Sequence, residues 1–168
     1  MEKLWSPWRS KYIESFKSDD DKSKCIFCQM LDLDKNDLDN LIVDKGELTI
    51  TVLNLYPYNN GHLMIIPKRH TNDFSGLSKD EITESFQKLQ LAERALTKIL
   101  KPHGFNIGAN IGKVAGAGIE EHIHFHIVPR WNGDSNFMPV IGDVKVISQD
   151  LAETKSKLLT AYKELSTK

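Results

Sequence analysis

Two periods of hydrophobic residues run along the chain, and each predicts a different kind of element. A period of two is typical of strands, because successive side chains of a strand point to opposite faces. Residues 47–53 alternate in this way and contain an unbroken β-branched run from Thr49 to Val52. Short apolar runs between turn residues predict three more strands, over residues 62–67, 105–111 and 122–129. We expect the glycine-rich segment 112–118 to join the last two strands as a hairpin.

After residue 77 the pattern changes to the period of an α-helix. Ser78 and Glu81 form the sequence pattern of a capping box, and Pro102 with Gly104 is expected to end the helix. Between these signals the apolar residues recur at helical spacing, at Ile82, Phe86, Leu89, Leu91, Ala95, Leu96 and Leu100. A second amphipathic helix is predicted over residues 148–167, with its lysines on a solvated face.

These elements predict an α+β fold with an antiparallel sheet of about five strands and two main helices. A chain of 168 residues is long enough for one sizeable core, so we expect a single domain over residues 1–168. The segment 1–30, which contains two tryptophans, and the C-terminal helix are expected to pack on this domain, since clustered aromatic residues are usually buried.

Composition and charge exclude several classes of partner. The hydrophobic fraction of 40% and the charged fraction of 27% are ordinary for globular proteins, and the net charge is −1. Without a basic field, neither a stable nucleic-acid partner nor an anionic membrane is expected. No apolar run resembles a signal peptide or a membrane span, which predicts a cytoplasmic protein. Both cysteines lie in one C-x-x-C motif, Cys25 and Cys28, which favours metal binding or redox chemistry over a structural disulfide.

The strongest chemical signal is the run His-Ile-His-Phe-His over residues 122–126. On a strand the three histidines would share one face, about 7 Å apart, while Ile123 and Phe125 enter the core from the other. Three solvated histidines on a half-exposed strand are one alternative. A metal site is a sharper alternative, because neutral imidazole is the commonest metal ligand.

This run and its surroundings resemble the histidine triad family, whose mark is His-x-His-x-His followed by apolar residues. Asn54 stands eight residues before His62, the sequence from Gly61 to Pro67 is similar to the family's second strand, and Asn110 precedes the glycine-rich turn. The resemblance covers residues 41–130. The sequences Leu-Trp-Ser-Pro-Trp-Arg (4–9) and Pro-Arg-Trp-Asn-Gly-Asp (129–134) further resemble the bacterial branch that includes diadenosine tetraphosphate phosphorylases and hydrolases.

The resemblance implies a role for each of these residues. His124 would attack the α-phosphorus of a nucleotide and carry the nucleotide covalently. His126 and His62 would bind phosphate oxygens and stabilise developing charge. Asn110 would donate to a phosphate oxygen or the leaving group, and Asn54 would face the ribose hydroxyls.

The turn at Gly116, Ala117 and Gly118 would let backbone amides approach a phosphate closely. Hydrolase branches of the family commonly place Gln or Ser shortly before the triad, where this chain has Gly118 and Ile119. This difference leaves the second substrate open between water and phosphate. The related hexose-1-phosphate nucleotidylyltransferases have Gln at the position of His126, so their reaction ranks low.

Some relatives bind zinc through a C-x-x-C pair and two histidines. By motif position the ligands here would be Cys25, Cys28, His70 and His122, forming a structural Zn²⁺ site. Two reduced, buried cysteines are the alternative; thioredoxin-like chemistry is disfavoured because no βαβ pattern follows the pair. No organic cofactor is expected. The resemblance also implies a homodimer, in which two half-barrel sheets join into one.

The leading hypothesis is an enzyme that cleaves a purine dinucleoside polyphosphate at its α-phosphate, with diadenosine tetraphosphate as the specific substrate. Phosphorolysis and hydrolysis both remain open. A nucleoside phosphoramidate hydrolase of the same family is one alternative. A metal-dependent hydrolase, or a module that only binds nucleotides or partners, are alternatives from other classes.

Overall fold

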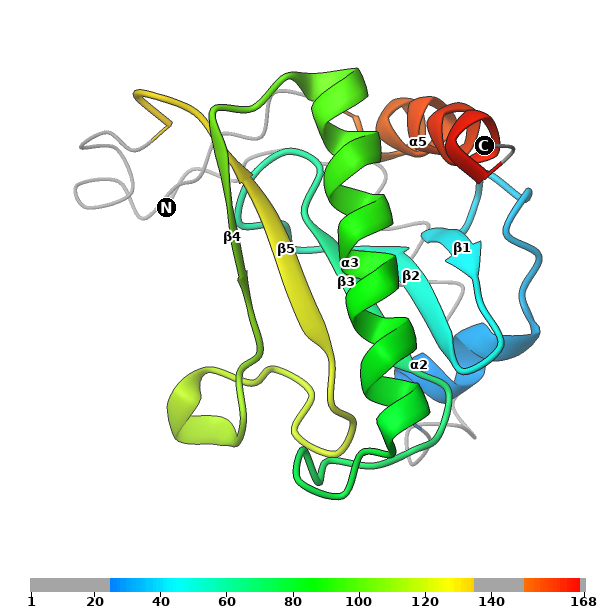
Figure 1. Ribbon diagram of the computed structural model, residues 1–168, viewed down its shortest axis with the longest axis vertical. Coiled ribbons are helices and arrows are strands. Elements are labelled where there is room, and N and C mark those ends of the chain that lie inside the picture. The colour runs from blue at the N-terminus through cyan, green and yellow to red at the C-terminus, as the bar shows by residue number, and fades with distance from the viewer. Residues whose placement is uncertain (1–24, 135–149, 167–168) are drawn as a thin grey trace, which may run out of the picture.

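The computed structural model describes residues 25–134 and 150–166 (Figure 1). The predicted packing of residues 1–24, and of the ends of the predicted C-terminal helix at residues 148–149 and 167, lies outside the described residues.

A five-stranded antiparallel sheet forms the centre of the domain, as the sequence predicts. Its strand order is β1-β2-β3-β5-β4, so β4 and β1 are the outer strands. The strands are β1 (Ile42–Lys45), β2 (Thr49–Leu53), β3 (Leu63–Pro67), β4 (Gly104–Gly108) and β5 (Phe125–Arg130). Pairing of β3 with β5 brings Met64 opposite His126, which joins the two histidine-bearing segments of the sequence.

Two features of the sheet differ from the sequence-based prediction. β1 has only four residues, too few to show a period in the sequence. The segment 112–118 lies between the antiparallel neighbours β4 and β5, as predicted, but the connection is longer than a tight hairpin turn, because β4 ends at Gly108 and β5 begins only at Phe125. Residues 109–124 form a long connection containing the 3₁₀ turn η2 (Lys113–Ala115), and His122 and His124 lie in it before the paired part of the strand.

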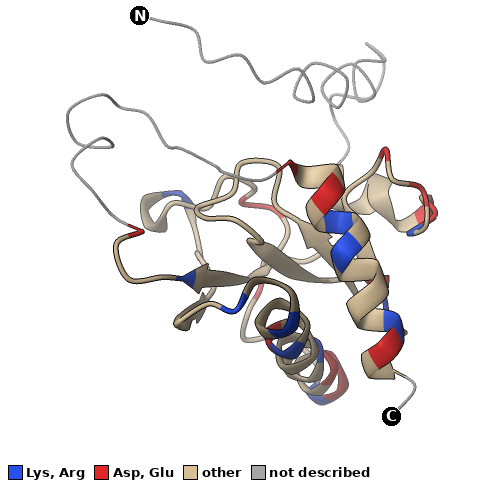
Figure 2. Cartoon of the chain, turned by 90° about the horizontal axis from the view of Figure 1, so that it is seen from above, with Lys and Arg blue, Asp and Glu red and all other residues tan. Residues whose placement is uncertain are grey.

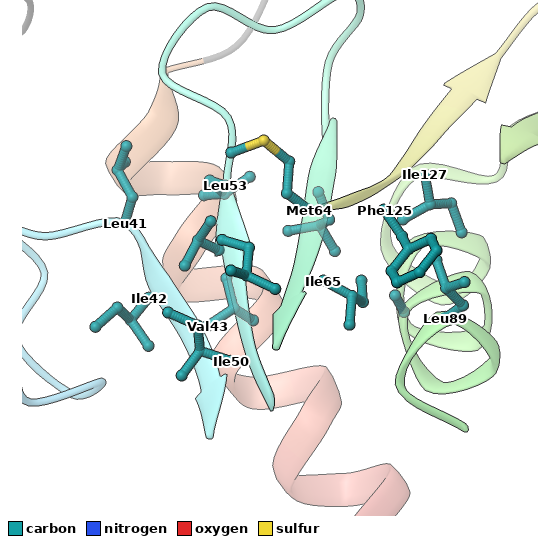
Figure 3. Close-up of a cluster of buried hydrophobic side chains, with 14 of the residues drawn as sticks. Leu41, Ile42, Val43, Ile50, Leu53, Met64, Ile65, Leu89, Phe125 and Ile127 are labelled. Carbon is teal, nitrogen blue, oxygen red and sulfur yellow. The ribbon is translucent and has the colours of Figure 1, made fainter. Parts of the chain in front are cut away.

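Helix α3 (Lys79–Leu100) crosses one face of the sheet (Figure 1). The predicted capping box is confirmed: the Ser78 side chain accepts from the Glu81 amide, and the Glu81 carboxylate accepts from the Ser78 amide. The helix ends at Leu100, and its C-cap Lys101 lies directly before Pro102, as predicted. Leu89 packs on the sheet beside Phe125 and Ile127 in the buried hydrophobic cluster of Figure 3.

The remaining helices are short α2 (Ile26–Gln29), followed by the 3₁₀ turn η1 (Met30–Asp32), and α5 (Leu151–Ser166). Lys/Arg and Asp/Glu are interspersed on α3 and α5 (Figure 2), so neither helix presents a face of one sign. No described helix is long and apolar enough to cross a membrane.

The prediction that the lysines of α5 lie on a solvated face is wrong at one position, Lys155. This side chain is fully buried, and its ammonium donates to the carbonyls of Asp37 (2.5 Å) and Asn40 (3.0 Å) and to Asn40 Oδ1 (3.0 Å). Burial lowers the pKa of Lys155 to about 8, against the raising effect of Asp37, Asp34 and Asp39. The lysine therefore fastens α5 to the loop before β1 by satisfying carbonyl groups there.

We predict that Lys155→Met lowers the free energy of unfolding by about 2 kcal/mol, because buried carbonyls lose their donor. Lys157→Met is the matched control, since Lys157 is on the same helix but forms only an exposed ion pair with Glu153; it should change stability by less than about 0.5 kcal/mol. Urea unfolding of both variants measures the difference. A Lys155→Met protein as stable as the wild type would show that burying the ammonium costs as much as its hydrogen bonds contribute.

Candidate active site and metal centre

The histidines of the sequence motif divide between two adjacent clusters. His62, His124 and His126 form the first, with ring centroids 4.8 Å apart for His124–His126 and 5.0 Å for His62–His126. All three are buried. His122 belongs to the second cluster, with Cys25, Cys28 and His70.

A backbone carbonyl determines which nitrogen of His124 carries the proton and which the lone pair. His124 Nδ1 lies 2.9 Å from the carbonyl oxygen of His122. Because a carbonyl oxygen only accepts, Nδ1 must carry the proton, and the lone pair of the neutral ring is on Nε2. Burial lowers the pKa of His124, more than the His122 carbonyl raises it. At neutral pH the ring is therefore uncharged, with Nε2 as a nucleophilic nitrogen.

His62 and His126 form a chain of hydrogen bonds whose direction is also set by the backbone. The Tyr58 amide donates to His62 Nδ1 at 3.0 Å, and Asn54 Nδ2 lies 3.3 Å from the same nitrogen. His62 therefore carries its proton on Nε2, which donates to His126 Nδ1 at 2.9 Å.

This series of hydrogen bonds ends at a buried donor on His126. With Nδ1 as an acceptor, neutral His126 carries its proton on Nε2, and that atom has no hydrogen-bond partner in the described part of the chain. Burial, and to a lesser extent the charge of His124, lowers the pKa of His126 to about 4. A buried polar atom without a partner calls for a ligand or water, and an N–H donor selects an electronegative atom such as a phosphate oxygen.

The predicted nucleotide-binding asparagines lie in two places, one beside His62 and one beside the glycine-rich turn. Asn54 adjoins His62, and its Oδ1 accepts from the Tyr56 amide at 2.9 Å. Asn110 lies against Gly116, since a Cβ added to that glycine would be 3.9 Å from Asn110 Nδ2. Gly116 has φ +90°, a conformation that favours glycine. Among the described residues, no hydrogen bond or ring contact joins Gly116, Ala117, Gly118 or Asn110 to the imidazoles.

An ion pair that sequence reasoning did not find holds the His62 turn against the end of β5. Asp134 binds Arg130 Nε and Nη2 at 2.7 and 2.8 Å, and also accepts from Asn59 Nδ2 and the Trp131 amide. Asn59 also donates to the Pro129 carbonyl at 3.1 Å. The only sign of this ion pair in the sequence is the polar end of the segment 129–134. The residue that Asp134 binds across the fold, Asn59, lies 75 positions away in the sequence.

The second cluster contains the four predicted metal ligands. Their ligand atoms all lie within 4.8 Å of one another. Cys25 Sγ is 3.2 Å and Cys28 Sγ 3.7 Å from His122 Nδ1, and Cys28 Sγ is 3.3 Å from His70 Nδ1. Tetrahedral zinc with Zn–S of about 2.3 Å and Zn–N of about 2.0 Å needs S···N separations of about 3.5 Å. The donor set and its spacing therefore fit a Cys₂His₂ zinc site.

His122 presents the correct nitrogen to this cluster. Its Nε2 lies 2.8 Å from the Pro67 carbonyl oxygen and must donate a proton to it, which leaves the lone pair on Nδ1, the atom that faces the sulfurs. Burial raises the pKa of the Cys28 thiol, and Cys25 raises it further. A pair of thiolates in this position therefore needs a neighbouring cation.

The residue that sequence reasoning missed in both clusters is Phe27, which lies inside the C-x-x-C motif. Its ring centroid is 5.1 Å from that of His124 and 5.6 Å from that of His122. An apolar residue between two cysteines carries no chemical signal in a sequence, so only the fold reveals this contact.

Comparisons with known proteins agree with this geometry. The chain is 39% identical to the AP-4-A phosphorylase of Mycobacterium tuberculosis over 165 residues, which cover 96% of the chain and 85% of that protein. It is 31% identical to an adenosine 5'-monophosphoramidase of Schizosaccharomyces pombe over 108 residues, or 64% of the chain and 75% of the relative. A solved structure of a Zn-bound histidine triad family protein from Mycobacterium smegmatis superimposes with a TM-score of 0.67 at 28% identity, covering 86% of the chain and 96% of the neighbour.

The model of the HIT domain matches residues 35–133, which include His62, the triad and Asn110. This match covers more than half of the chain and contains the first cluster in full. The fold, the order of its motifs and the geometry of the imidazoles thus agree, and the chain belongs to the histidine triad (HIT) family.

Proposed function

We propose that this HIT-family nucleotide-processing enzyme cleaves purine dinucleoside polyphosphates at the α-phosphate through a nucleotide carried on His124. Diadenosine tetraphosphate is the proposed substrate, supported by the 39% identity to an AP-4-A phosphorylase. The observation that carries the mechanism is the paired placement of a free Nε2 lone pair on His124 and an unpartnered Nε2–H on His126.

In the first step His124 Nε2 forms a bond to the α-phosphorus while the bond to the bridging oxygen breaks. The electron pair of that bond leaves with the polyphosphate product. The His124 ring becomes positively charged, and its Nδ1–H bond to the His122 carbonyl stabilises that charge. His126 Nε2–H donates to a non-bridging oxygen, and the bond from His62 Nε2–H keeps the His126 ring in the required tautomer.

In the second step an acceptor oxygen forms a bond to the same phosphorus while the P–Nε2 bond breaks. The electron pair of that bond returns to Nε2 and restores neutral His124, and an acceptor water loses a proton to solvent. Phosphate as acceptor yields a nucleoside diphosphate, and water yields a monophosphate. The similarity to a phosphorylase favours phosphate. Asn54, beside His62, is proposed to bind the ribose hydroxyls, and Asn110 with the Gly116–Gly118 amides to bind the leaving phosphates.

A phosphoramidate is a second candidate substrate, because the chain is also similar to an adenosine 5'-monophosphoramidase. The same attack by His124 would then break a P–N bond. Turnover of adenosine 5'-monophosphoramidate, compared with that of diadenosine tetraphosphate, ranks the two substrates.

We predict that wild type converts diadenosine tetraphosphate to ADP and ATP only with inorganic phosphate, and that His124→Ala lowers kcat by about 1,000-fold or more. Product identification by chromatography measures both results, with His103→Ala as the control because this exposed histidine lies outside the clusters. AMP and ATP without phosphate would instead identify a hydrolase. Full activity in His124→Ala would overturn the covalent mechanism and favour a metal-dependent hydrolase, whereas nucleotide binding with no turnover of either substrate class would favour a binding module.

We also propose that Cys25, Cys28, His70 and His122 hold a structural zinc ion. The support is the donor set, its spacing and the Nδ1 lone pair of His122. A bound zinc ion would neutralise the thiolate pair and hold the chain around α2 against the triad segment.

We predict about one zinc ion per chain by elemental analysis of the purified protein. Cobalt substitution should give the absorption of a tetrahedral site with two sulfur ligands. Cys28→Ser should lose most of the bound metal, because one sulfur ligand is removed, and His103→Ala should keep it. Equal zinc contents in Cys28→Ser and wild type would exclude this ligand set.

A homodimer is the proposed assembly, formed along β4. This strand pairs only with β5 among the described strands, so its other edge offers unpaired backbone groups. Ile107 of β4 is 54% exposed, and Ile82 and Phe86, from the apolar positions at helical spacing in α3, are 41% and 56% exposed. Ile107 is the cross-strand partner of Ile127, on the sheet face that α3 covers, so these apolar residues lie on one side of the domain. A second copy would cover them.

We predict that Ile107→Lys converts a dimer to a monomer in sedimentation velocity, since a charge would be buried in the contact. Leu38→Lys is the matched control, because Leu38 is 49% exposed in the loop before β1, which is the outer strand at the opposite edge of the sheet from β4. A wild-type monomer, or dimers in both variants, would exclude the β4 interface.

A further inference from the structure

We propose that Phe27 is a positioning residue for His124, and that a metal ion in the Cys₂His₂ site keeps Phe27 in place. The consequence is that metal occupancy controls the alignment of the nucleophile. The inference rests on the proposed roles of His124 and of the metal site, and it adds a physical link between them.

Phe27 is the only described side chain that makes ring contacts with both His122 and His124. It is 2% exposed and meets His124 at an interplanar angle of 60° and His122 at 84°. Ring centroids 5.1 and 5.6 Å apart at such angles are typical of favourable edge-to-face packing.

The contact restrains His124 without consuming its reactive lone pair. The bond from Nδ1 to the His122 carbonyl fixes one atom of the ring, but rotation about that bond would still move Nε2. A packed phenyl ring blocks this rotation and excludes water, and it has no N–H or O–H group that could bind Nε2. A polar residue in its place would compete with the phosphorus for the lone pair.

The segment that carries Phe27 has little stability of its own. Helix α2 has four residues, and its N-cap residue Cys25 makes no side-chain capping bond. A single turn of helix is not stable in isolation, because nucleation is unfavourable. The position of Phe27 therefore depends on tertiary contacts, which are the packing of its side chain in the hydrophobic core and the contacts at the ends of the turn.

The contacts at the ends of the turn are made by two sulfur atoms. Cys25 and Cys28 flank Phe27, and their Sγ atoms lie 3.2 and 3.7 Å from His122 Nδ1. A shared metal ion would tie both ends of the turn to His122 and so would limit how far Phe27 can move from His124. Without the ion, the apolar packing of Phe27 remains, but the sulfur atoms at the ends of the turn keep only weak S···N contacts, and Cys28 is partly exposed.

The first test is Phe27→Leu in the full-length, zinc-loaded protein. We expect kcat to fall about 10- to 100-fold, with KM changed less than about threefold and zinc content unchanged. Phe74→Leu is the matched control, because Phe74 is 46% exposed and makes no ring contact with the triad histidines; its kcat should equal that of wild type. A Phe27→Leu protein with wild-type kcat and zinc content would overturn the positioning role.

The second test does not depend on turnover or on the folding of one variant. The His124 ring proton signal, assigned by its loss in His124→Ala, is followed by NMR in histidine-labelled protein while zinc is removed and restored. In wild type we expect a reversible shift toward the Phe27→Leu position, because the ring current of Phe27 is lost; in Phe27→Leu the shift should be small. No shift in wild type, or an equal shift in both proteins, would show that Phe27 does not transmit metal occupancy. Failure of the proposed function would appear separately, as full activity in His124→Ala.

Discussion

The hydrogen bond from His124 Nδ1 to the His122 carbonyl oxygen is the interaction on which the rest of the site depends. It selects the tautomer of the proposed nucleophile, and it does so with a backbone atom whose position follows from the chain path. That path is held by the Ile123 amide, which donates to the Thr71 carbonyl at 2.7 Å, and by the His122 ring, which donates to the Pro67 carbonyl. Four buried histidines thus take their proton positions from main-chain groups or from one another, and none needs a charged partner to be neutral.

This arrangement explains why a cluster of polar rings can sit in an otherwise apolar sheet. Burying an imidazole without partners costs free energy, and the cost falls when each ring nitrogen is paired. Of the four rings, His122 and His62 are paired at both nitrogens, while His124 and His126 each present Nε2 to a ligand. The incomplete pairing is confined to one nitrogen on each of two neighbouring rings, whose centroids are 4.8 Å apart. This is the pattern expected of a site that binds a reactant and not of a purely structural core.

The sequence predicts those parts of this fold that depend on hydrophobic periodicity or on capping and turn residues. The capping box at Ser78 and the strand signals of β2 and β3 are confirmed, because each depends only on residues close together in the sequence. Other features depend on residues distant in the sequence: the Lys155 contacts with Asp37 and Asn40, the Asn59–Asp134 bond and the packing of Phe27 on His124. The length of the connection before β5 was missed, because glycines indicate where the chain turns but not how many residues separate the two paired strands. The grouping of the four metal ligands followed from the family resemblance, and the structure brings them together.

The ion pair of Arg130 with Asp134 has a consequence for how charged molecules are recognised. Arg130 uses Nε and Nη2 on Asp134 and Nη1 on Asn106, so its charge is already compensated at the end of the triad strand. The groups that we propose to face the phosphate of the substrate are neutral imidazoles, whose attraction is short-ranged and depends on direction. Neutral donors respond weakly to dissolved ions, whereas attraction by lysine and arginine side chains is screened. We therefore expect the binding energy supplied by the triad to persist at ionic strengths that weaken long-range electrostatic capture.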